Sequence, residues 1–551
     1  MKKNFFLTGI LTTAFLFGCS DDVPDKGGVN GVTGDVGYVK VAINLPTVSG
    51  NSVKANGNDI FDDGIEAEYK VNDIILAIFE GTDENDADFK EAQNLSGLLA
   101  MQSGDNNVTV KYKSDVLEIG KPGDNKNVYA LAIVNGSKLF SVDENKKLKF
   151  DGTDFSGKLS KLNTVAQNVD LSKIANLEGK NFLMTNAPIT NKPAVNSVTD
   201  GREVTTLVEL KVYDTKAKAE ANWENADQIY VERAVAKVTT SVKGTGNTLT
   251  ISAPGMAYDE ATVTFEGWKL NLTNKTYFPV RNVSNWSTWE GYNTGTDVNR
   301  FFGETANPYR VYWAIDPNYT NTVVQGTTDL NVITELPEGQ WNMMDKDEYS
   351  AENTTTAGQM KRARLTGVLL KAKFTLKGGT ENDNLFMLGT SSSIYSEKQL
   401  LDFLKTTLGY DLQVKSGATA QTITTAEKVK EVFEFKDATA MDDTKAGDIL
   451  KTCSDKIRFY KGGVMFYYTT VIKHFNSISE AGVTEYDENK HLGLYGVVRN
   501  NWYDIRINSV SGPGEPEIPE IPDEPVNKEH SFINAEINIL SWAKRTQDVD
   551  L

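Results

Sequence analysis

The feature that most constrains this chain is a strand pattern at its far end, separated from the preceding residues by regularly spaced prolines. The apolar residues of the pattern fall on alternate positions: Ile533, Ala535, Ile537 and Ile539. The prolines fall on every third position: Pro513, Pro516, Pro519, Pro522 and Pro525. A period of two predicts a strand with one buried face. A period of three fits a polyproline II segment with one proline per turn.

The linker decides which partner this strand can reach. Residues 511–530 form the predicted linker, and its proline-rich part spans roughly 40 Å at about 3.1 Å per residue. That reach is enough to carry residues 531–551 off their own domain and onto a neighbour. We therefore expect the strand, which includes Leu540 and extends toward Trp542, to complete a sheet in another copy of the same chain.

Length, charge and histidine content exclude several function classes. The chain has 551 residues, which is too long for a single core and favours two domains. Its net charge of -18 argues against nucleic-acid binding, which needs basic patches. The three histidines have no near spacing, so a histidine-based metal site or catalytic triad is not expected. We expect no cofactor, no metal ion and no enzymatic activity.

The N-terminus carries an export signal. Two lysines, Lys2 and Lys3, precede an apolar run, residues 5–17, which is too short to span a bilayer as a helix. The run leads into Leu-Phe-Gly-Cys, which resembles the lipobox of bacterial lipoproteins, so Cys19 is the predicted lipidation site. An ordinary signal peptide with a chance cysteine is the alternative. With Cys19 in this role, Cys453 has no partner and no disulfide is expected.

A second alternating strand lies near the start of the chain. Its apolar residues share one face: Val39, Val41, Ile43 and Leu45. Pro46 ends the strand, and a polar loop, residues 47–58, follows it. An apolar strand therefore lies near each end of the chain. We hypothesise that the first strand occupies a groove in its own domain until proteolysis removes it.

The body of the chain is predicted to be mostly strands. β-branched, aliphatic and aromatic residues dominate these runs, and Gly, Asn and Asp separate many of them. The clearest runs are 73–79, 108–112, 127–134, 204–210, 231–238, 261–272, 309–315, 365–376, 457–473 and 492–510. Their spacing is typical of antiparallel sandwiches.

Helices are a minority, and one polar stretch suggests a domain boundary. A capping-box pattern predicts a helix that begins at Ser396. A short helix is expected near Thr425, and a weaker candidate covers residues 89–99. We place the boundary between the two domains in the polar stretch 217–228.

Several motifs give the chain a resemblance to a known family. Beside the lipobox, they are the runs Asn181–Asn186, Val231–Val238, Val464–Tyr468 and Val497–Tyr503, with the terminal runs 537–542 and 549–551. On these residues the chain resembles the fimbrillins of the Bacteroidetes FimA/Mfa family, and within it the Mfa-type shaft subunit. The resemblance covers nearly the whole chain.

This resemblance implies a fold and an order of domains. The fold is mostly β, with two antiparallel β-sandwich domains of transthyretin-like, Greek-key topology, minor helices, and a C-terminal donor strand on a Pro-rich linker. The implied segments are a signal peptide (1–19), a propeptide with the removable first strand (20–54), an N-terminal domain (55–225), a C-terminal domain (226–510), the linker (511–530) and the donor strand (531–551).

The resemblance also implies a processing route. Fimbrillins are exported as lipoproteins, lose the first strand to a surface protease, and polymerise head-to-tail by donor-strand exchange. The first arginine in this chain is Arg202, so a trypsin-like enzyme that cuts before the first domain must cut at lysine. We expect cleavage between Lys54 and Ala55, with cleavage elsewhere in the loop as the alternative.

The expected role is a structural subunit of a surface fimbria that supports adhesion and biofilm formation. The acidic run Ser20-Asp21-Asp22 resembles the signal that sends Bacteroidetes lipoproteins to the cell surface. The precursor is therefore expected in the outer membrane, held by palmitate and other acyl chains, and the mature form in the extracellular fimbria. Expected partners are further copies of the chain, accessory tip and anchor subunits, and host or bacterial surface receptors.

Two alternatives remain open from sequence alone. One is a tip or accessory adhesin of the same family, which would lack a donor strand to pass on. The other is a monomeric surface lipoprotein that binds glycans, which would keep its N-terminus and form no oligomers.

Overall fold

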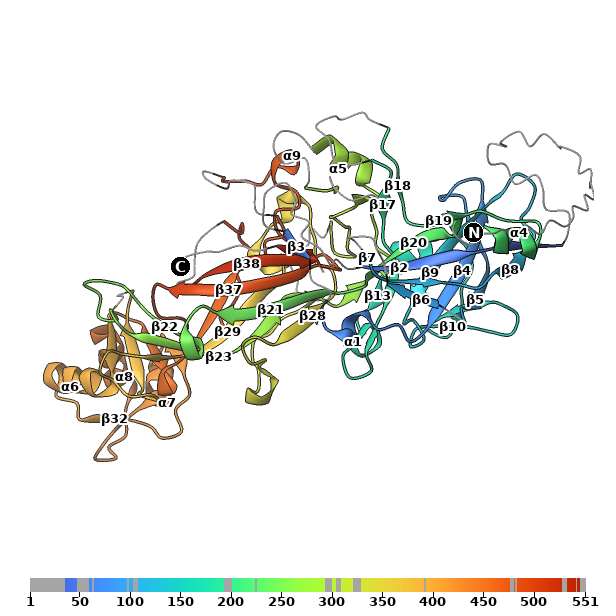
Figure 1. The fold of residues 1–551 in the computed structure, drawn as a ribbon. Helices are drawn as coiled ribbons and strands as arrows, with labels where there is room; N and C mark the ends of the chain where they lie inside the picture. The colour runs from blue at the N-terminus through green and yellow to red at the C-terminus, as the bar shows by residue number, and fades with distance from the viewer. Residues whose placement is uncertain are drawn as a thin grey trace, which may run out of the picture.

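The computed structural model shows an elongated molecule in which two sheet-based units follow one another, with a smaller helical unit at the far end (Figure 1). It describes residues 35–46, 59–61, 64–96, 99–102, 108–192, 201–222, 225–292, 300–303, 309–320, 329–390, 393–475, 480, 483–527, 533–541 and 543–545. The described part is mostly β, with largely antiparallel pairing, as the sequence predicted.

The first unit is built on a nine-stranded sheet. In spatial order its path is β5 (Asp88–Asn94), β4 (Ile74–Gly81), β9 (Asn127–Val134), β16 (Met184–Asn186), β20 (Asp227–Arg233), β2 (Val41–Pro46), β7 (Val108–Lys113) and β6 (Leu99–Gln102), with β19 (Val208–Leu210) also paired to β9. Smaller elements surround it: β1 (Val36–Val39) paired with β8 (Leu117–Gly120), β10 (Phe140–Val142), β11 (Leu148–Phe150), β12 (Thr153–Asp154), β14 (Ala175–Asn176), β15 (Asn181–Phe182), α1 (Glu66–Tyr69), α2 (Ser160–Asn163), α3 (Leu171–Ile174) and α4 (Lys216–Ala221). One hydrophobic core lies within this unit.

The second unit has two sheets that share a hydrophobic core. One sheet has the order β28 (Asp347–Ser350), β21 (Ala236–Val242), β37 (Trp502–Val510), β38 (Ile533–Ser541), β39 (Ala543–Arg545) and β3 (Asp59–Phe61). The other has the order β22 (Thr248–Thr250), β23 (Thr262–Asn271), β29 (Gly367–Thr375) and β36 (Val464–Val471). Three small sheets are also present: β13 (Gln167–Asn168) with β25 (Thr276–Tyr277), β17 (Ile189–Thr190) between β18 (Val204–Thr205) and β26 (Tyr309–Arg310), and β24 (Thr273–Asn274) with β27 (Leu330–Asn331). Two helices, α5 (Trp286–Tyr292) and α9 (Glu488–His491), contact each other.

A third core, which the sequence did not reveal, lies between β29 and β36 in the chain. It is formed by β30 (Leu385–Leu388), β31 (Ile394–Ser396), β32 (Leu412–Val414), β33 (Gln421–Ile423), β34 (Phe433–Phe435), β35 (Ile457–Tyr460), α6 (Glu397–Leu408), α7 (Ala426–Val432) and α8 (Asp443–Thr452). The predicted helix at Ser396 is confirmed, since the Ser396 hydroxyl accepts from the Gln399 backbone N–H and the Gln399 side chain caps the Ser396 N–H. The helix near Thr425 is confirmed as α7.

The predicted helix over residues 89–99 is wrong. Residues 88–94 form strand β5, which pairs antiparallel with β4. Lys90, Glu91 and Ala92 are good helix formers, but the open edge of β4 offers backbone partners to the whole segment. The edge-to-face contact of Phe89 with Phe79 fixes the strand further. Tertiary pairing therefore overrides the local helix propensity.

The run 231–238 is two strands rather than one. β20 ends at Arg233 in the first sheet, and β21 begins at Ala236 in the second. Val235 is buried in the first core and Ala236 in the second. The change from one core to the next therefore comes after the polar stretch 217–228, because β20 is needed between β16 and β2.

A buried ionic cluster joins the two units. Glu68 of α1 lies 2.9 Å from the Lys237 Nζ and accepts a hydrogen bond from the Tyr349 hydroxyl at 2.5 Å. The Arg233 Nε donates to the Glu68 backbone carbonyl at 2.8 Å. Lys237 also pairs with Asp347 at 3.0 Å. Because Glu68 is fully buried, this cluster ties the start of the first unit to β21 and β28 of the second.

Candidate functional site: the first and the last strands

The predicted first strand is divided in the structure, because Val39 ends β1, which pairs with β8 in a separate sheet. The remaining predicted residues, Val41, Ile43 and Leu45, lie in β2, and β2 lies inside the first sheet rather than at its edge. It pairs parallel with β20 and antiparallel with β7. Ile43 faces Ile229 on one side and Tyr112 on the other. In Figure 1 the blue arrow of β2 lies beside β20. Removal of β2 would leave two unpaired strand edges facing each other across a groove.

Both faces of β2 are covered. Val41, Ile43 and Leu45 of β2 are fully buried in the first core, as is Val39 at the end of β1. On the opposite face Ala42 is fully buried and Asn44 is 2% exposed. The Asn44 Nδ2 lies 3.2 Å from the Gln228 Oε1 and 3.4 Å from the Ile229 backbone oxygen. A replacement strand must therefore fit an apolar face and a polar face. Sequence reasoning described only the apolar one.

Three predicted processing residues lie outside the described residues: Cys19, Lys54 and Ala55. The described chain resumes at β3, which belongs to the second unit and pairs antiparallel with β39 near the C-terminus. The residues just after the predicted cleavage loop therefore lie beside the terminal segment. β2 and β38, in contrast, lie in different sheets.

The predicted donor strand is β38, which contains Ile533, Ala535, Ile537, Ile539 and Leu540, while Trp542 lies outside the described residues. In this single chain β38 pairs antiparallel with β37 of its own second unit. This corrects the expectation that the strand stands off its own domain. The physical reason is proximity, because the chain delivers an apolar strand beside an open edge of β37 and intramolecular pairing has a high effective concentration.

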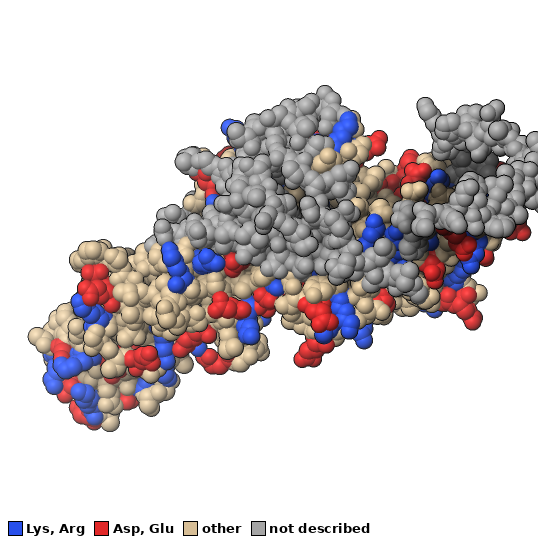
Figure 2. Space-filling view, in the orientation of Figure 1, with Lys and Arg blue, Asp and Glu red and all other residues tan. Residues whose placement is uncertain are grey.

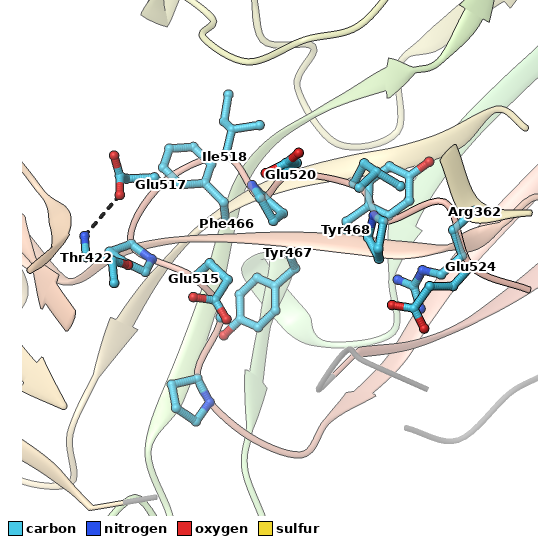
Figure 3. Close-up of a pocket in the computed structure, with 16 residues that line it drawn as sticks. Arg362, Thr422, Phe466, Tyr467, Tyr468, Glu515, Glu517, Ile518, Glu520 and Glu524 are labelled. Carbon is cyan, nitrogen blue, oxygen red and sulfur yellow. Dashed lines mark hydrogen bonds between the residues drawn. The ribbon is translucent and has the colours of Figure 1, made fainter. Parts of the chain in front are cut away.

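The linker also departs from the predicted free rod, because it binds along the second unit. Glu515 exchanges two backbone hydrogen bonds with Phe466 of β36, at 2.8 and 2.9 Å. The Tyr467 hydroxyl donates to the Gly512 carbonyl at 3.3 Å, and the Glu517 carboxylate accepts from the Thr422 N–H at 3.0 Å. Phe466, Tyr467, Glu515, Glu517 and Thr422 line a pocket of about 430 Å³ between the linker and β36 (Figure 3). Prolines on either side of Glu515 limit the pairing, since they carry no N–H.

A charged clamp fixes the end of the linker. Arg364 donates a bidentate pair of hydrogen bonds to the Asp523 carboxylate, from Nε to Oδ1 at 2.9 Å and from Nη2 to Oδ2 at 2.9 Å. The Lys361 Nζ lies 3.2 Å from the Asp523 Oδ2. The Arg364 guanidinium lowers the pKa of the Asp523 carboxyl. Burial acts in the opposite direction, and Lys361 lowers the pKa further. Val526 follows, 4% exposed, and its N–H bonds to the Met360 carbonyl at 3.2 Å. The structure therefore holds the linker as far as Val526. Sequence reasoning missed Asp523 and Arg364, because nothing in the linker composition singles out one acidic residue.

Other chemistry is sparse in the part of the chain that the structure describes. No three His, Cys, Asp or Glu side chains there gather in a way that could hold a metal ion. Burial raises the pKa of the Cys453 thiol to about 12, so this thiol is not a nucleophile at neutral pH. None of the described helices has the length and apolar character needed to cross a membrane. Figure 2 shows acidic and basic side chains interspersed over the visible described surface, without a large basic patch.

Comparison with known proteins identifies the C-terminal region. Residues 458–548 match the family described as major fimbrial subunit protein type IV, fimbrillin, C-terminal. This segment contains β36, β37, the linker and β38. The predicted resemblance to fimbrillins is thus confirmed over this region, and the match supports a fimbrial subunit role. No curated protein matches the chain significantly.

Several solved structures are similar at low identity. A cell adhesion protein from Parabacteroides distasonis is 12% identical, with 93% of this chain and 98% of that chain covered and a TM-score of 0.36. A fimbrillin from Porphyromonas gingivalis is 12% identical, with coverages of 91% and 96% and a TM-score of 0.36. A tip fimbrial protein from Porphyromonas gingivalis is 11% identical, with coverages of 92% and 100% and a TM-score of 0.33.

Proposed function

We propose that this chain, which carries a fimbrillin C-terminal region, is a structural subunit of a cell-surface fimbria. It is exported as a lipoprotein through Cys19, loses its first strand by cleavage between Lys54 and Ala55, and polymerises head-to-tail by donor-strand exchange. It acts as a building block rather than as an enzyme. The fimbria supports adhesion and biofilm formation, and accessory tip and anchor subunits complete it.

The observation that carries this proposal is the placement of the two end strands. β2 lies between two other strands and is buried on both faces. A polar loop, residues 47–58, follows it in the sequence. Such a strand can be cut from the chain and leave a groove behind. Each large aliphatic side chain that refills the groove contributes about 1.5–3 kcal/mol. A donor strand with several of them, together with its backbone ladder, gives a long-lived joint.

The terminal strand has what the donor role requires. β38 pairs with a single neighbour over most of its length, β37, and is joined to the held linker through residues 527–532. Its pairing with β37 keeps it ordered in the single chain, which limits unwanted association before export. Transfer to a neighbour exchanges this pairing for a groove that buries both faces. A head-to-tail contact of this kind does not close on itself and therefore extends into a filament.

A gel of unboiled surface extract tests the proposal. Cells that express the full chain should give a ladder of polymers that collapses to one band on boiling. N-terminal sequencing of the mature protein should begin at Ala55, and Lys54→Gln should block maturation by a trypsin-like protease. A lone monomer band with an uncut N-terminus would contradict the proposal and favour a monomeric lipoprotein.

A further inference from the structure

The groove that β2 occupies is selective on its polar face as well as on its apolar face. Asn44 is almost fully buried there, with its amide beside the Gln228 Oε1 and the Ile229 carbonyl. A strand with an apolar residue in place of Asn44 would withdraw this donor from the buried Ile229 carbonyl and from the half-buried Gln228 Oε1. Leaving a buried acceptor unpaired costs about 1–3 kcal/mol. The incoming strand is therefore expected to carry an amide at this position.

The terminal strand carries the same three-residue pattern as β2. Ile537-Asn538-Ile539 matches Ile43-Asn44-Leu45 in sequence. If Asn538 takes the place of Asn44, Ile537 and Ile539 take the places of Ile43 and Leu45. The remaining apolar residues then fall in register as well, with Ala535 at Val41 and Ile533 at Val39. The three apolar positions of β2 are therefore filled, and Ile533 reaches the position that Val39 holds at the end of β1.

Other registers fit worse. A shift of two residues in one direction places Leu540 at Asn44 and Ser541 at Leu45, so that a hydroxyl enters an apolar site. A shift of two in the other direction places Glu536 at Asn44 and Ala535 at Ile43. Reversal of the strand with Asn538 kept at Asn44 places the apolar Leu540, rather than the carboxylate of Glu536, opposite the buried Lys113. Shifts of one residue exchange the two faces of the strand.

Charge favours the same register. Lys113 of β7 is 4% exposed and lies directly opposite Ala42. Lys40, next to β2, is 6% exposed, and its pKa is lowered by burial and by Lys113, while Asp115 and Glu220 act in the opposite direction. In the favoured register Asn534 replaces Lys40 and Glu536 replaces Ala42. The exchange therefore removes one lysine from the surroundings of Lys113 and places a carboxylate opposite it.

We propose that the terminal strand enters the groove of the next copy in one register, with Asn538 in place of Asn44 and Glu536 paired with Lys113 of the receiving copy. These two polar residues select the strand and its register, and the apolar residues supply most of the affinity. The inference rests on the proposed function, because it assumes that β38 replaces β2.

Pairs of cysteines introduced into the full chain test the register directly, because a disulfide forms only between positions that lie opposite each other. In an antiparallel pair, opposite Cβ atoms are about 4.5–5.5 Å apart, close to the separation that a disulfide needs. Lys113→Cys with Glu536→Cys should therefore cross-link neighbouring copies, giving a ladder that survives boiling without reductant. Lys111→Cys with Asn538→Cys should do the same, because Lys111 lies opposite Asn44. The matched control, Lys113→Cys with Asn538→Cys, lies two residues out of register and should leave a ladder that collapses on boiling.

Charge reversal tests the selective pair without relying on disulfide geometry. Glu536→Lys should reduce the yield of polymer by about tenfold or more, since like charges directly opposite each other are destabilising. Lys113→Glu combined with Glu536→Lys should restore at least half of the polymer. Glu536→Gln, which removes the charge but keeps the size, should have an intermediate effect.

The outcomes separate this inference from the proposed function. If the unmodified chain forms no ladder, donor-strand polymerisation fails, and the register fails with it. If ladders form but the control pair cross-links in preference to the two predicted pairs, the register is wrong while polymerisation stands. Ladders with no cross-link in any pair, and no rescue by charge reversal, would also overturn the register.

Discussion

Two isoleucines that face each other in the first sheet should respond differently when the chain matures. Ile43 of β2 and Ile229 of β20 are cross-strand partners, and both are fully buried. If β2 is removed on maturation, Ile43→Ala affects only the precursor. Ile229→Ala affects the precursor and the polymer, because β20 stays in place. The pair therefore provides a perturbation and its matched control within one core.

The size of the effect follows from the burial. A fully buried isoleucine that is cut back to alanine typically lowers the free energy of unfolding by about 2–5 kcal/mol. In a unit of this size that corresponds to a fall in melting temperature of roughly 4–15 °C. We expect a fall in this range for both variants in the secreted precursor. In the polymer we expect such a fall for Ile229→Ala and none for Ile43→Ala.

The assay compares two forms of each variant. Thermal unfolding of the uncleaved precursor, followed by circular dichroism, gives the first value. The temperature at which the ladder collapses in a detergent gel, after heating in small steps, gives the second. A polymer that is weakened equally by both variants would show that β2 remains in the assembled subunit and would refute the reasoning.

Three further predictions concern residues around the two strands. Burial raises the pKa of Asp227 to about 6. The folded state therefore binds the Asp227 proton more tightly than the unfolded state does. The stability that protonated Asp227 contributes is fully present below about pH 4 and is lost as the pH rises through about 6. Asp227→Asn should remove about 1–2 kcal/mol of that pH dependence after allowance for partial solvent exposure, as measured by denaturant unfolding from pH 4 to 7. Asp523→Asn should weaken the clamp to Arg364 and speed cleavage of the linker in limited proteolysis severalfold, with melting of the first core unchanged; unaltered cleavage would contradict the clamp. Glu68→Ala should lower the free energy of unfolding by about 3 kcal/mol, because it removes a buried carboxylate partner of the buried Lys237. A change below about 1 kcal/mol would contradict this role.

The strand content could be predicted from the sequence because the signal is local. Residues 127–134 were predicted as a strand and form β9 with the same bounds. The helix at Ser396 was predicted from its capping residues and is present. Both depend on side chains within a few positions of one another, which is the range over which periodicity and capping act.

Features that depend on distant pairing could not be predicted. Residues 88–94 form a strand because β4 offers an edge, and residues 227–233 belong to the first sheet because β2 and β16 need a partner between them. The third core escaped notice because its strands are only three or four residues long and its helices supply much of its apolar surface.

The candidate site shows the same division. The apolar alternation of Val41, Ile43 and Leu45 in the sequence predicted a strand with one buried face, and these residues lie in β2. Nothing in the sequence showed that the opposite face is covered too, so the role of Asn44 emerged only with Gln228 beside it. The docking of β38 on β37 was also hidden, because the prolines indicate an extended linker without indicating its direction.

Truncation of the terminal strand tests the central claim most directly. A chain that ends after Asn527 keeps the clamped linker and loses β38. Its precursor should fold, reach the cell surface and be cleaved, but unboiled surface extract should show no ladder. When the full chain is expressed beside it, the truncated chain should appear only as a terminal subunit of the polymers that the full chain forms. A truncated chain that still formed a full ladder by itself would show that β38 is not the donor.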